Sequence, residues 1–567
     1  MIRISVQRRR DLPISFLALI LCVLCASAVY PGQWTKELAP GVTLTQITKT
    51  PDDNAIPRVI NILKVDPKTP GIRVQMVLGK DKVWDTGSTN GRETVGSMAK
   101  RLDAVAAING DFFPFSGDPL NLCIGVGELI SEPHENRSVF GLTSDGKCLF
   151  DRLEFDAKIT LPDGKWFPIR GINRPRGQNE LVAFTPKFFT STCTKPDGSE
   201  AVVKLENGPV KVGVPLKGTV SSVKPDSGDT AIADGTIVLS GWGTGSDFIK
   251  ESLHEGMAVN IEFDLKPAGW ENITEAVGGA CRIIRDGKIA IEMEEEHVGL
   301  LFVNTTHPRT AIGSTRDGKL VMVTVDGRQS ISTGFPLPDL AKLMLEQGCV
   351  DAINLDGGGS STMATSFGTI NCPSDGPLRP VSDGLAVFQD RTVPDSARDF
   401  NIALPTGTVE SGESVQLTLT DPDGNPLDAA VASKAVWCTN GGAGFVDQSG
   451  LFFGYKAAKG EVVARLGSSI VSVPIETIPA PASRLTADLK ADADMPNRAV
   501  LSTRLTDLNG NGVRGQIAVQ VKSGTPDESV IITGKDGKAS TAITWDGTTG
   551  QVEIRHGTLK PLVIQPS

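Results

Sequence analysis

The sequence predicts a large mixed α/β (α+β) region, residues 35–390, followed by two small all-β sandwiches, residues 397–478 and 480–567. A chain of 567 residues is long enough for several domains. Its 61 glycines and 36 prolines break elements into short pieces, which favours strands joined by turns. Helical spacing of apolar residues occurs only before residue 390, whereas alternating apolar and polar residues dominate after it.

The first 28 residues predict a signal peptide. Arg3 and the basic run 8–10 precede an apolar run, Leu17 to Cys25, and Ala26-Ser-Ala28 fits a signal-peptidase cleavage site. The apolar run is short for a membrane span, although an uncleaved anchor is the alternative. We therefore expect an exported protein, secreted, periplasmic or at the cell surface, with no stable membrane span after cleavage.

Charge and cysteine content limit the classes of partner. The net charge of −10 argues against a nucleic-acid binder, whose surface should be basic. Nine cysteines minus Cys22 and Cys25 of the signal peptide leave seven, so at most three disulfides can form. Their wide scatter does not resemble a zinc site. Cys123–Cys148 and Cys349–Cys372 are candidate bridges, with the connectivity left open.

The two C-terminal units begin after polar, Pro-containing breaks. The first break lies between Gln389 and Arg398, and the second is Pro479-Ala-Pro-Ala. Short alternating runs with turn signals predict small sandwiches. Residues 437–464 resemble bacterial immunoglobulin-like modules, and residues 507–512 resemble the related invasin-type modules. This resemblance implies contacts with a cell surface or matrix.

Two segments before residue 390 share one pattern, in which a helix leads into a buried strand and then a polar loop. In the first, the strand 104–108 ends at Asn109-Gly-Asp111. In the second, a helix begins near Pro338 and stops at Gly348, and the strand 350–355 ends at Asp356-Gly-Gly-Gly-Ser-Ser361.

A hairpin precedes the second of these helices. Residues 311–315 turn at Asp317-Gly318 and return as residues 320–325, which end at Asp326-Gly-Arg328. This return strand, the helix and the strand 350–355 form a βαβ unit, so the two strands should be parallel. The loops 326–328 and 356–361 should then share one sheet edge, where α/β proteins bind ligands.

The residues of these loops suit an anionic ligand. The three glycines 357–359 let a ligand approach the backbone and expose N–H groups that can hold an anion. Arg328 carries a planar fork suited to phosphate or carboxylate. Asp356 could be a base, a nucleophile or a metal ligand, and these roles stay open. The alternative is that the glycines form only a flexible loop.

Other hydrolase signatures are missing. Residues 358–362 lack the last glycine of G-x-S-x-G, and the chain has neither a Walker loop nor H-E-x-x-H. The five histidines do not pair at metal-binding spacing, and His307 suits a structural role better than a catalytic one.

The chain from Thr35 to Gln389 resembles the phosphodiester glycosidase family, whose bacterial members include proteins linked to exopolysaccharides. The segments that carry the resemblance are 107–113, 125–128, 137–141, 171–176, 278–279, 308–313, 325–328, 352–361 and 381–384. The resemblance implies hydrolysis of a sugar–phosphate link at the anomeric carbon. A carboxylate can stabilise or attack the oxocarbenium-like state, and a phosphate leaving group needs positive charge and N–H donors more than an acid.

The resemblance also implies roles for individual residues. Asp356 or Asp326 would act at the anomeric centre, with Glu128 as a lesser candidate. Many relatives have a small residue at the position of Asp111. The residues expected to bind sugar hydroxyls or phosphate are Asn109, Asp111, Arg309, Arg328, Asn354, Gly357, Gly358, Gly359, Ser360 and Ser361.

Two other functions stay open. One is a non-catalytic carbohydrate-binding or matrix protein built on an enzyme-like scaffold. The other is a metal-dependent phosphodiesterase that breaks the O–P bond, with a divalent cation such as calcium or magnesium held by aspartates. We name no metal ligands, and we expect a sugar phosphodiester or polysaccharide as the substrate.

Overall fold

A computed structural model describes residues 32–49, 56–114, 116–390, 398–492, 495, 497–547 and 550–565. The predicted signal peptide lies outside the described residues, as does the link 391–397. The fold is mostly β, because the longest α-helix of the described residues, α4 (Leu337–Glu346), has only 10 residues. The expectation of a mixed α/β region before residue 390 is therefore corrected to a strand-rich one. No described helix is long and apolar enough to cross a membrane.

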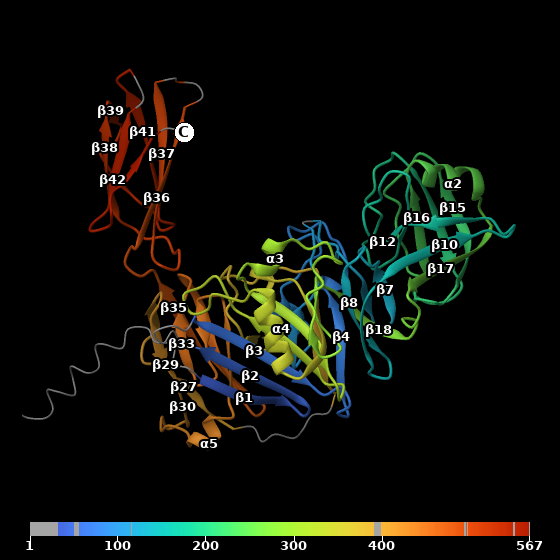
Figure 1. Ribbon diagram of the computed structural model, residues 1–567, viewed down its shortest axis with the longest axis horizontal. Helices are drawn as coiled ribbons and strands as arrows, with labels where there is room; N and C mark the ends of the chain where they lie inside the picture. Colours follow the sequence, from blue (N-terminus) through green and yellow to red (C-terminus); the bar gives the residue numbers. More distant parts are fainter. Residues whose placement is uncertain are drawn as a thin grey trace, which may run out of the picture.

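Two large sheets form the body of the molecule (Figure 1). The first runs in the order β1 (Gly32–Ala39), β2 (Val42–Lys49), β3 (Arg58–Val65), β22 (Leu320–Val325), β21 (Arg309–Thr315), β23 (Cys349–Asn354), β19 (Arg282–Arg285) and β20 (Lys288–Ile289). The second runs in the order β28 (Thr408–Glu410), β35 (Ser469–Ile478), β34 (Ala458–Leu466), β31 (Val436–Asn440), β25 (Gly368–Thr369), β24 (Met363–Thr365), β5 (Ala106–Asn109), β26 (Asp383–Gln389) and β4 (Ile72–Leu78). One apolar core, which includes Leu44, Leu63, Ile108 and Leu385, joins the two sheets.

A helix covers the outer face of each sheet. Leu337 and Leu340 of α4 pack with Ile62 and Val323 of the first sheet. On the other side, α1 (Val95–Arg101) packs against β5, β24 and β26 of the second sheet. The predicted start of α4 at Pro338 and its stop at Gly348, which has φ +89°, are confirmed. The order of layers is therefore helix, sheet, sheet, helix.

The predicted βαβ direction is confirmed, with one difference. Strand β21 is antiparallel to both β22 and β23 and lies between them, so β22 and β23 are parallel but not neighbours. The hairpin return that carries β22 thus ends at the same sheet edge as β23. The loops 326–328 and 356–361, which follow these two strands, therefore lie at one sheet edge, as predicted.

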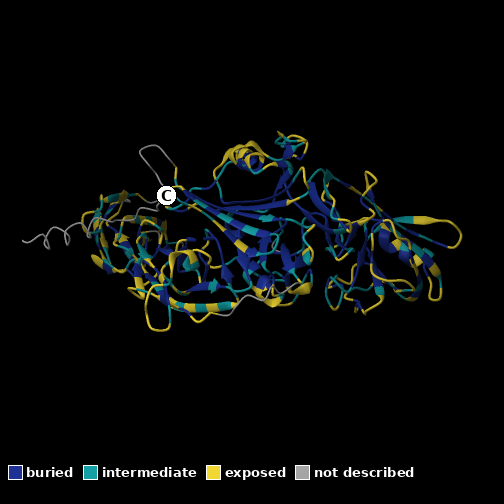
Figure 2. Ribbon diagram, turned by 90° about the horizontal axis from the view of Figure 1, so that it is seen from below, coloured by how far each residue is buried: buried dark blue, intermediate teal, exposed yellow. Residues whose placement is uncertain are grey.

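A separate lobe is inserted in the body (green in Figure 1). Its sheet runs in the order β11 (Trp166–Ile169), β10 (Glu154–Thr160), β17 (Ala258–Lys266), β15 (Leu216–Lys224), β14 (Ser199–Leu205), β16 (Thr236–Gly241), β13 (Leu181–Phe184) and β12 (Gly171–Ile172), with α2 (Thr244–Ser252) packed on it. A small sheet lies between lobe and body, in the order β7 (Glu128–Ser131), β6 (Cys123–Gly125), β18 (Ile273–Gly278), β8 (Ser138–Thr143) and β9 (Cys148–Arg152). Figure 2 shows exposed residues concentrated in the turns of the lobe.

The first C-terminal unit is joined to the body through a shared sheet. Thr439 of β31 bridges to Thr369 of β25, so the second sheet of the body continues into this unit. Cys438 and Val463 belong to the core of the body. The smaller strands of the unit are β27 (Asn401–Ala403), β29 (Ser414–Gln416), β30 (Thr418–Thr420), β32 (Gly444–Val446) and β33 (Leu451–Gly454), with helix α5 (Ala429–Ala432).

The last unit has its own core and two four-stranded sheets (red in Figure 1). One sheet contains β36 (Arg484–Ala491), β37 (Arg498–Thr506), β41 (Lys538–Trp545) and β39 (Gly524–Pro526). The other contains β40 (Val530–Ile532), β38 (Gln516–Lys522), β42 (Gln551–Arg555) and β43 (Leu562–Ile564). The immunoglobulin-like character of both C-terminal units stays a prediction.

The seven cysteines of the described residues are all free, so the candidate bridges Cys123–Cys148 and Cys349–Cys372 are not formed. Packing explains this difference. The Cys123 sulfur contacts Met76 of β4, and Cys349 packs with α4, whereas Cys372 lies in a different apolar cluster.

Candidate active site

Loops from both sheets of the body meet at one point. Asn109 ends β5, and its Nδ2 donates to the carbonyl of Asp356 at 2.7 Å. The amide of Asp356, just after β23, donates to the carbonyl of Gly110 at 3.0 Å. The two loops singled out in the sequence, 109–111 and 356–361, are therefore hydrogen-bonded to each other.

The glycine loop, residues 357–361, forms a tight 3-10 turn, η3 (Gly358–Ser360). Its amides are mostly used inside the protein. Gly357 donates to Asp356 Oδ1 at 2.8 Å, Gly358 to the Pro308 carbonyl at 2.9 Å, and the two serines to carbonyls within the loop. The expectation that the loop presents bare N–H groups to an anion is thus wrong for these four amides, because the turn itself uses them.

Close approach explains why the loop needs glycine. A Cβ at Gly357 would lie 2.8 Å from the Pro308 carbonyl oxygen, and one at Gly359 would overlap Asp375 and Arg379. Gly358 has φ +62°, a conformation that glycine adopts without strain. The loop is a compact platform and not a flexible linker.

Asp356 stands at the start of this platform. It is partly exposed, and its Oδ1 accepts the hydrogen bond from Gly357. Burial raises the pKa of Asp356 to about 6, although hydrogen bonds from Ser360 and Gly357 and the charge of Arg379 act to lower it. Near neutral pH its carboxylate is therefore available as a base or nucleophile.

Asp326 has a different environment, although it ends the parallel strand β22. It is 1% exposed, and its carboxylate accepts from Asn371 Nδ2 at 2.7 Å and from the Cys372 amide at 2.9 Å. Burial raises the pKa of Asp326 to about 7. Asn371 also donates to the Ser361 carbonyl at 3.0 Å. Asp326 therefore braces the glycine loop through Asn371.

A pair of buried acids, Asp111 and Asp383, lies beside Asp356. The Asp111 amide donates to Asp383 Oδ1 at 2.8 Å, and the Asp111 carboxylate accepts from the amides of Phe112 and Asn121. Burial and the neighbouring Asp383 raise the pKa of Asp111 well above its ordinary value. Burial raises the pKa of Asp383 to about 6, and its charge acts to raise that of Asp356.

Two arginines face the glycine loop. Arg328 is exposed, and its Nη2 would lie 3.2 Å from a Cβ placed on Gly358. Its guanidinium also contacts His307 Nδ1 at 3.2 Å, and burial together with Arg328 lowers the pKa of His307. Arg379 Nη1 lies 3.4 Å from Ser360 Oγ. Arg379 also pairs with Asp375 at 2.7 Å, and its charge acts on Asp356, whereas Arg328 lies beside Gly358.

Neither Arg379 nor Asp383 is among the site residues predicted from the sequence. Asp383 belongs to segment 381–384, which resembles the family, so the sequence could have indicated Asp383 as a site residue. Arg379 lies in a loop without a recognisable motif, and only the tertiary structure places it beside Ser360. No local pattern of residues could have identified it.

Arg309 was expected to bind phosphate, but its guanidinium is used inside the protein. The side chain is 2% exposed. It donates to the carbonyls of Phe335, Phe302 and Thr305 at 2.8–2.9 Å. Burial lowers the pKa of Arg309 to about 10. The residue therefore holds α3 (Leu300–Asn304) against the loop before β21.

Glu128, the lesser catalytic candidate, is placed elsewhere. It begins β7 and lies 3.8 Å from Lys187 Nζ. It lines a cavity of about 360 Å³ together with Thr185 and Leu205, and none of the lining residues belongs to the group around Asp356. Burial raises its pKa. The structure thus does not bring Glu128 together with Asp356.

The remaining predicted residues divide into bracing and unsatisfied groups. Asn109 Oδ1 accepts from Thr310 Oγ1 and the Thr362 amide, so its side chain is fully used. By contrast, Asn354 Oδ1 and Ser361 Oγ are buried without a hydrogen-bond partner among the described residues. Such atoms are costly unless a ligand or water satisfies them. They are the polar side-chain atoms of the predicted site residues that lack a partner among the described residues.

The described part of the chain contains no group of three or more His, Cys, Asp or Glu side chains arranged to hold a metal ion. The aspartates of the site are instead satisfied by amides and by Asn371.

Comparisons with known proteins relate part of the chain to a known family. Residues 210–388 match the phosphodiester glycosidase family. The SPbeta prophage-derived uncharacterized protein YomE of Bacillus subtilis (strain 168) is 41% identical over 127 residues, 22% of this chain and 20% of that protein. The N-acetylglucosamine-1-phosphodiester alpha-N-acetylglucosaminidase of Bos taurus is 40% identical over 110 residues, 18% of this chain and 21% of that protein.

The chain spans about a fifth of the length of these curated relatives. A hypothetical protein from Synechocystis shares the fold, with a TM-score of 0.53, 21% identity and 64% of each chain covered. The family match includes Asp326, Asp356, Arg379 and Asp383. Residues 210–388, about a third of the chain, are therefore similar to the phosphodiester glycosidase family.

Proposed function

We propose that this protein hydrolyses the bond between the anomeric carbon and the phosphate of a sugar-1-phosphodiester. The observation that carries the proposal is that Asp356 begins a glycine platform whose residues Gly358 and Ser360 lie beside Arg328 and Arg379. The family match supports the same reaction class. The name of the bovine relative suggests N-acetylglucosamine as the sugar to test first.

Each group has a chemical task in this proposal. The Asp356 carboxylate stabilises or attacks the oxocarbenium-like anomeric carbon. Arg328 and Arg379 neutralise the departing phosphate, which is already a weak base and needs charge more than a proton. Asn354 and Ser361 bond sugar hydroxyls, and Asp326 positions the platform without contacting the substrate.

We further propose that the protein is exported and acts on surface or extracellular glycans. The basic and apolar N-terminal segment supports export, since it has the order of a signal peptide. The two C-terminal β units support contact with a cell surface or matrix.

Asp356→Asn tests the proposed reaction. The assay uses the methyl phosphodiester of N-acetylglucosamine 1-phosphate in heavy-oxygen water, with the products identified by NMR. We expect label on the sugar and a loss of kcat of about a thousandfold, because the change removes the acting carboxylate. Asp317→Asn, an exposed change in the β21–β22 turn, is the matched control.

Three outcomes would contradict the proposal. Label in the phosphate would indicate cleavage of the O–P bond. Binding of the diester without turnover would indicate a carbohydrate-binding protein. Wild-type turnover in a folded Asp356→Asn variant would remove Asp356 from the mechanism.

A further inference from the structure

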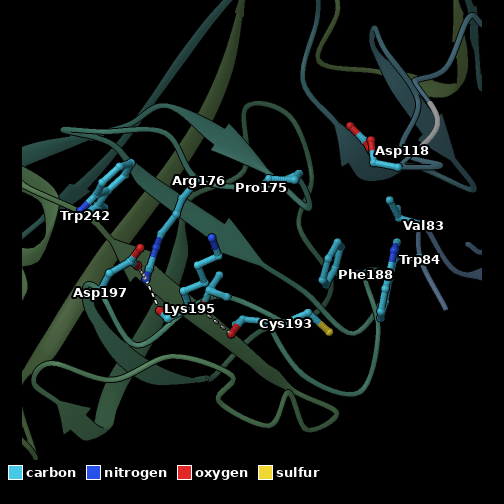
Figure 3. A pocket seen from close by; sticks show the side chains of 13 residues that line it. Val83, Trp84, Asp118, Pro175, Arg176, Phe188, Cys193, Lys195, Asp197 and Trp242 are labelled. Carbon is cyan, nitrogen blue, oxygen red and sulfur yellow. Dashed lines mark hydrogen bonds and ion pairs between the residues drawn. The ribbon is translucent and has the colours of Figure 1, made fainter. Parts of the chain in front are cut away.

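A cavity of about 410 Å³ lies where the lobe meets the body (Figure 3). Its volume is within the range of roughly 300–1,000 Å³ typical of ligand pockets. The body contributes Trp84 and Asp118, and the lobe contributes Phe188, Lys195 and Trp242. No residue of the Asp356 platform lines it, so it is distinct from the site described above.

Aromatic rings form two sides of the cavity. Trp84 and Phe188 are stacked, with ring centroids 6.4 Å apart and planes 12° from parallel. The amide of Trp84 donates to the Phe188 carbonyl at 3.1 Å, which fixes the body against the lobe here. Figure 3 shows Trp242 across the cavity from this pair. Aromatic faces and edges of this kind suit the apolar C–H face of a sugar ring.

The polar side is held in place by a buried carboxylate. Glu200 is 0% exposed and accepts from the hydroxyls of Thr192, Thr194 and Ser240 at 2.7–2.8 Å. Burial alone would raise the pKa of Glu200, but hydrogen bonds, including those from these hydroxyls, hold it below its ordinary value. Thr192 and Thr194 line the cavity. Their hydroxyls are therefore fixed before any ligand arrives.

Two charged side chains of the lining have unused bonding capacity. Neither Lys195 nor Asp118 makes a hydrogen bond or ion pair with its side chain among the described residues. Figure 3 shows the Lys195 amino group directed into the cavity, between Arg176 and Phe188. The two cations of the lining, Arg176 and Lys195, are balanced by Asp118 and Asp197. This balance favours a neutral, hydroxyl-rich ligand over a phosphate.

One loop connects the cavity with the acidic pair of the site. Asp111 accepts from the Asn121 amide at 2.6 Å, and the loop closed by this bond carries Asp118 to the cavity. Gly79 lies a few residues before Trp84 in the chain. Its amide donates to the carbonyl of Ser382, the residue before Asp383, at 2.8 Å. A substrate longer than one sugar phosphate could therefore contact both places.

We propose that the 410 Å³ cavity binds a neutral sugar ring of a glycan that extends beyond the sugar phosphate held at Asp356. The part of this statement that concerns Asp356 rests on the proposed function. The binding of a sugar ring in the cavity does not, and it can be tested without turnover.

Cys193 provides that test, because it lines the cavity and is the one exposed cysteine of the described residues. The probe is the trisaccharide of N-acetylglucosamine, and the readout is the rate of alkylation of Cys193 by iodoacetamide. We expect saturating trisaccharide to slow alkylation by about tenfold, which corresponds to occupancy of the cavity for most of the time. Trp242→Ala and Lys195→Ala should each weaken this protection.

Matched variants make the result specific. Trp166→Ala removes an exposed tryptophan from β11 of the same lobe, outside this cavity, and should leave protection unchanged. Lys195 is exposed, so its replacement should not disturb folding. The Lys195 variant therefore keeps the test decisive if the Trp242 variant fails to fold. Absence of protection in the wild type, or full protection in both cavity variants, would overturn the proposal.

A kinetic comparison tests the link with the Asp356 site. We expect Lys195→Ala to lower kcat/KM roughly tenfold for a diester that carries the trisaccharide and to leave the methyl diester unaffected. An equal effect on both substrates would overturn the link. If the wild type cleaves neither diester, the proposed function is wrong. The alkylation experiment still tests whether the cavity binds a sugar ring, because it needs no turnover.

Discussion

Asp356 and Asp326 follow parallel strands of one sheet, yet their carboxylates have different surroundings. Asp356 is partly exposed and receives a hydrogen bond from the next residue of its loop. Asp326 is enclosed and bonded to Asn371 and Cys372. Both acids could be predicted as site residues from the sequence. The bracing role of Asp326, which leaves Asp356 as the proposed acting carboxylate, could not, because it depends on Asn371, which lies 45 residues further along the chain.

The pH dependence of turnover should report the ionisation of Asp356. Its pKa is raised to about 6, so kcat/KM should increase as the pH rises through about 6 and the carboxylate forms. The charge of Arg379 acts to lower the pKa of Asp356. Arg379→Gln should therefore move the rising part of the pH–rate profile to higher pH, whereas Arg379→Lys should leave its position nearly unchanged. Initial rates between about pH 4 and pH 8, about two units either side of this pKa, measure the effect. A flat profile would contradict the prediction.

Arg309 should contribute to stability and not to phosphate binding. Arg309→Met removes the three hydrogen bonds that a buried guanidinium donates to carbonyls, so we expect a loss of about 3 kcal/mol or more in the free energy of unfolding. Urea denaturation measures this loss, with the exposed Arg316→Met as the control. Unchanged stability together with a raised KM would instead support the original phosphate role.

At the scale of elements, the glycine loop is rigid because its neighbours leave no room for side chains. Four of its five amides are paired, and loops from β5, β21 and the 372–379 segment surround it. The strand ends and the glycine run could be predicted from periodicity and composition. The insertion of β21 between β22 and β23 could not, because a hairpin followed by a helix does not determine on which side the strand packs.

Gly359→Ala tests the packing of this loop. The added Cβ would overlap Asp375 and Arg379, so we expect turnover to fall by about tenfold or more as Arg379 is displaced. Gly299→Ala at the start of α3 is the matched control, because its Cβ would meet no atom within 4 Å. Crystal structures or heteronuclear NMR spectra of both variants would show whether the change stays local. Full activity of Gly359→Ala would show that the position of Arg379 is not critical.

At the scale of the molecule, the first C-terminal unit supports the site. Tyr455 Oη donates to the Ser374 carbonyl at 3.3 Å, and Phe445 and Phe453 pack with Cys372, whose amide holds Asp326. The sequence indicated a boundary near residue 390 because composition changes there. Composition does not reveal that β31 continues a sheet of the body, since the pairing with β25 joins residues 70 positions apart.

Truncation at two positions tests this support. A chain ended at residue 390 exposes β25 and the apolar residues around Cys372, so we expect loss of turnover and of cooperative unfolding. A chain ended at residue 480 lacks only the last unit, which has its own core, and should keep wild-type turnover. Turnover and thermal unfolding of both chains measure the difference. Full activity of the shorter chain would contradict the prediction.

The shared sheet also limits how this chain can be recombined. Exchange of residues 398–478 for an unrelated β unit would leave Thr369 and Cys372 facing surfaces that did not evolve to match them. Inherited substitutions in this unit should then impair chemistry at a distance, although the unit itself carries none of the reacting groups. The unit that should be exchanged as a whole is accordingly the stretch from residue 32 to residue 478.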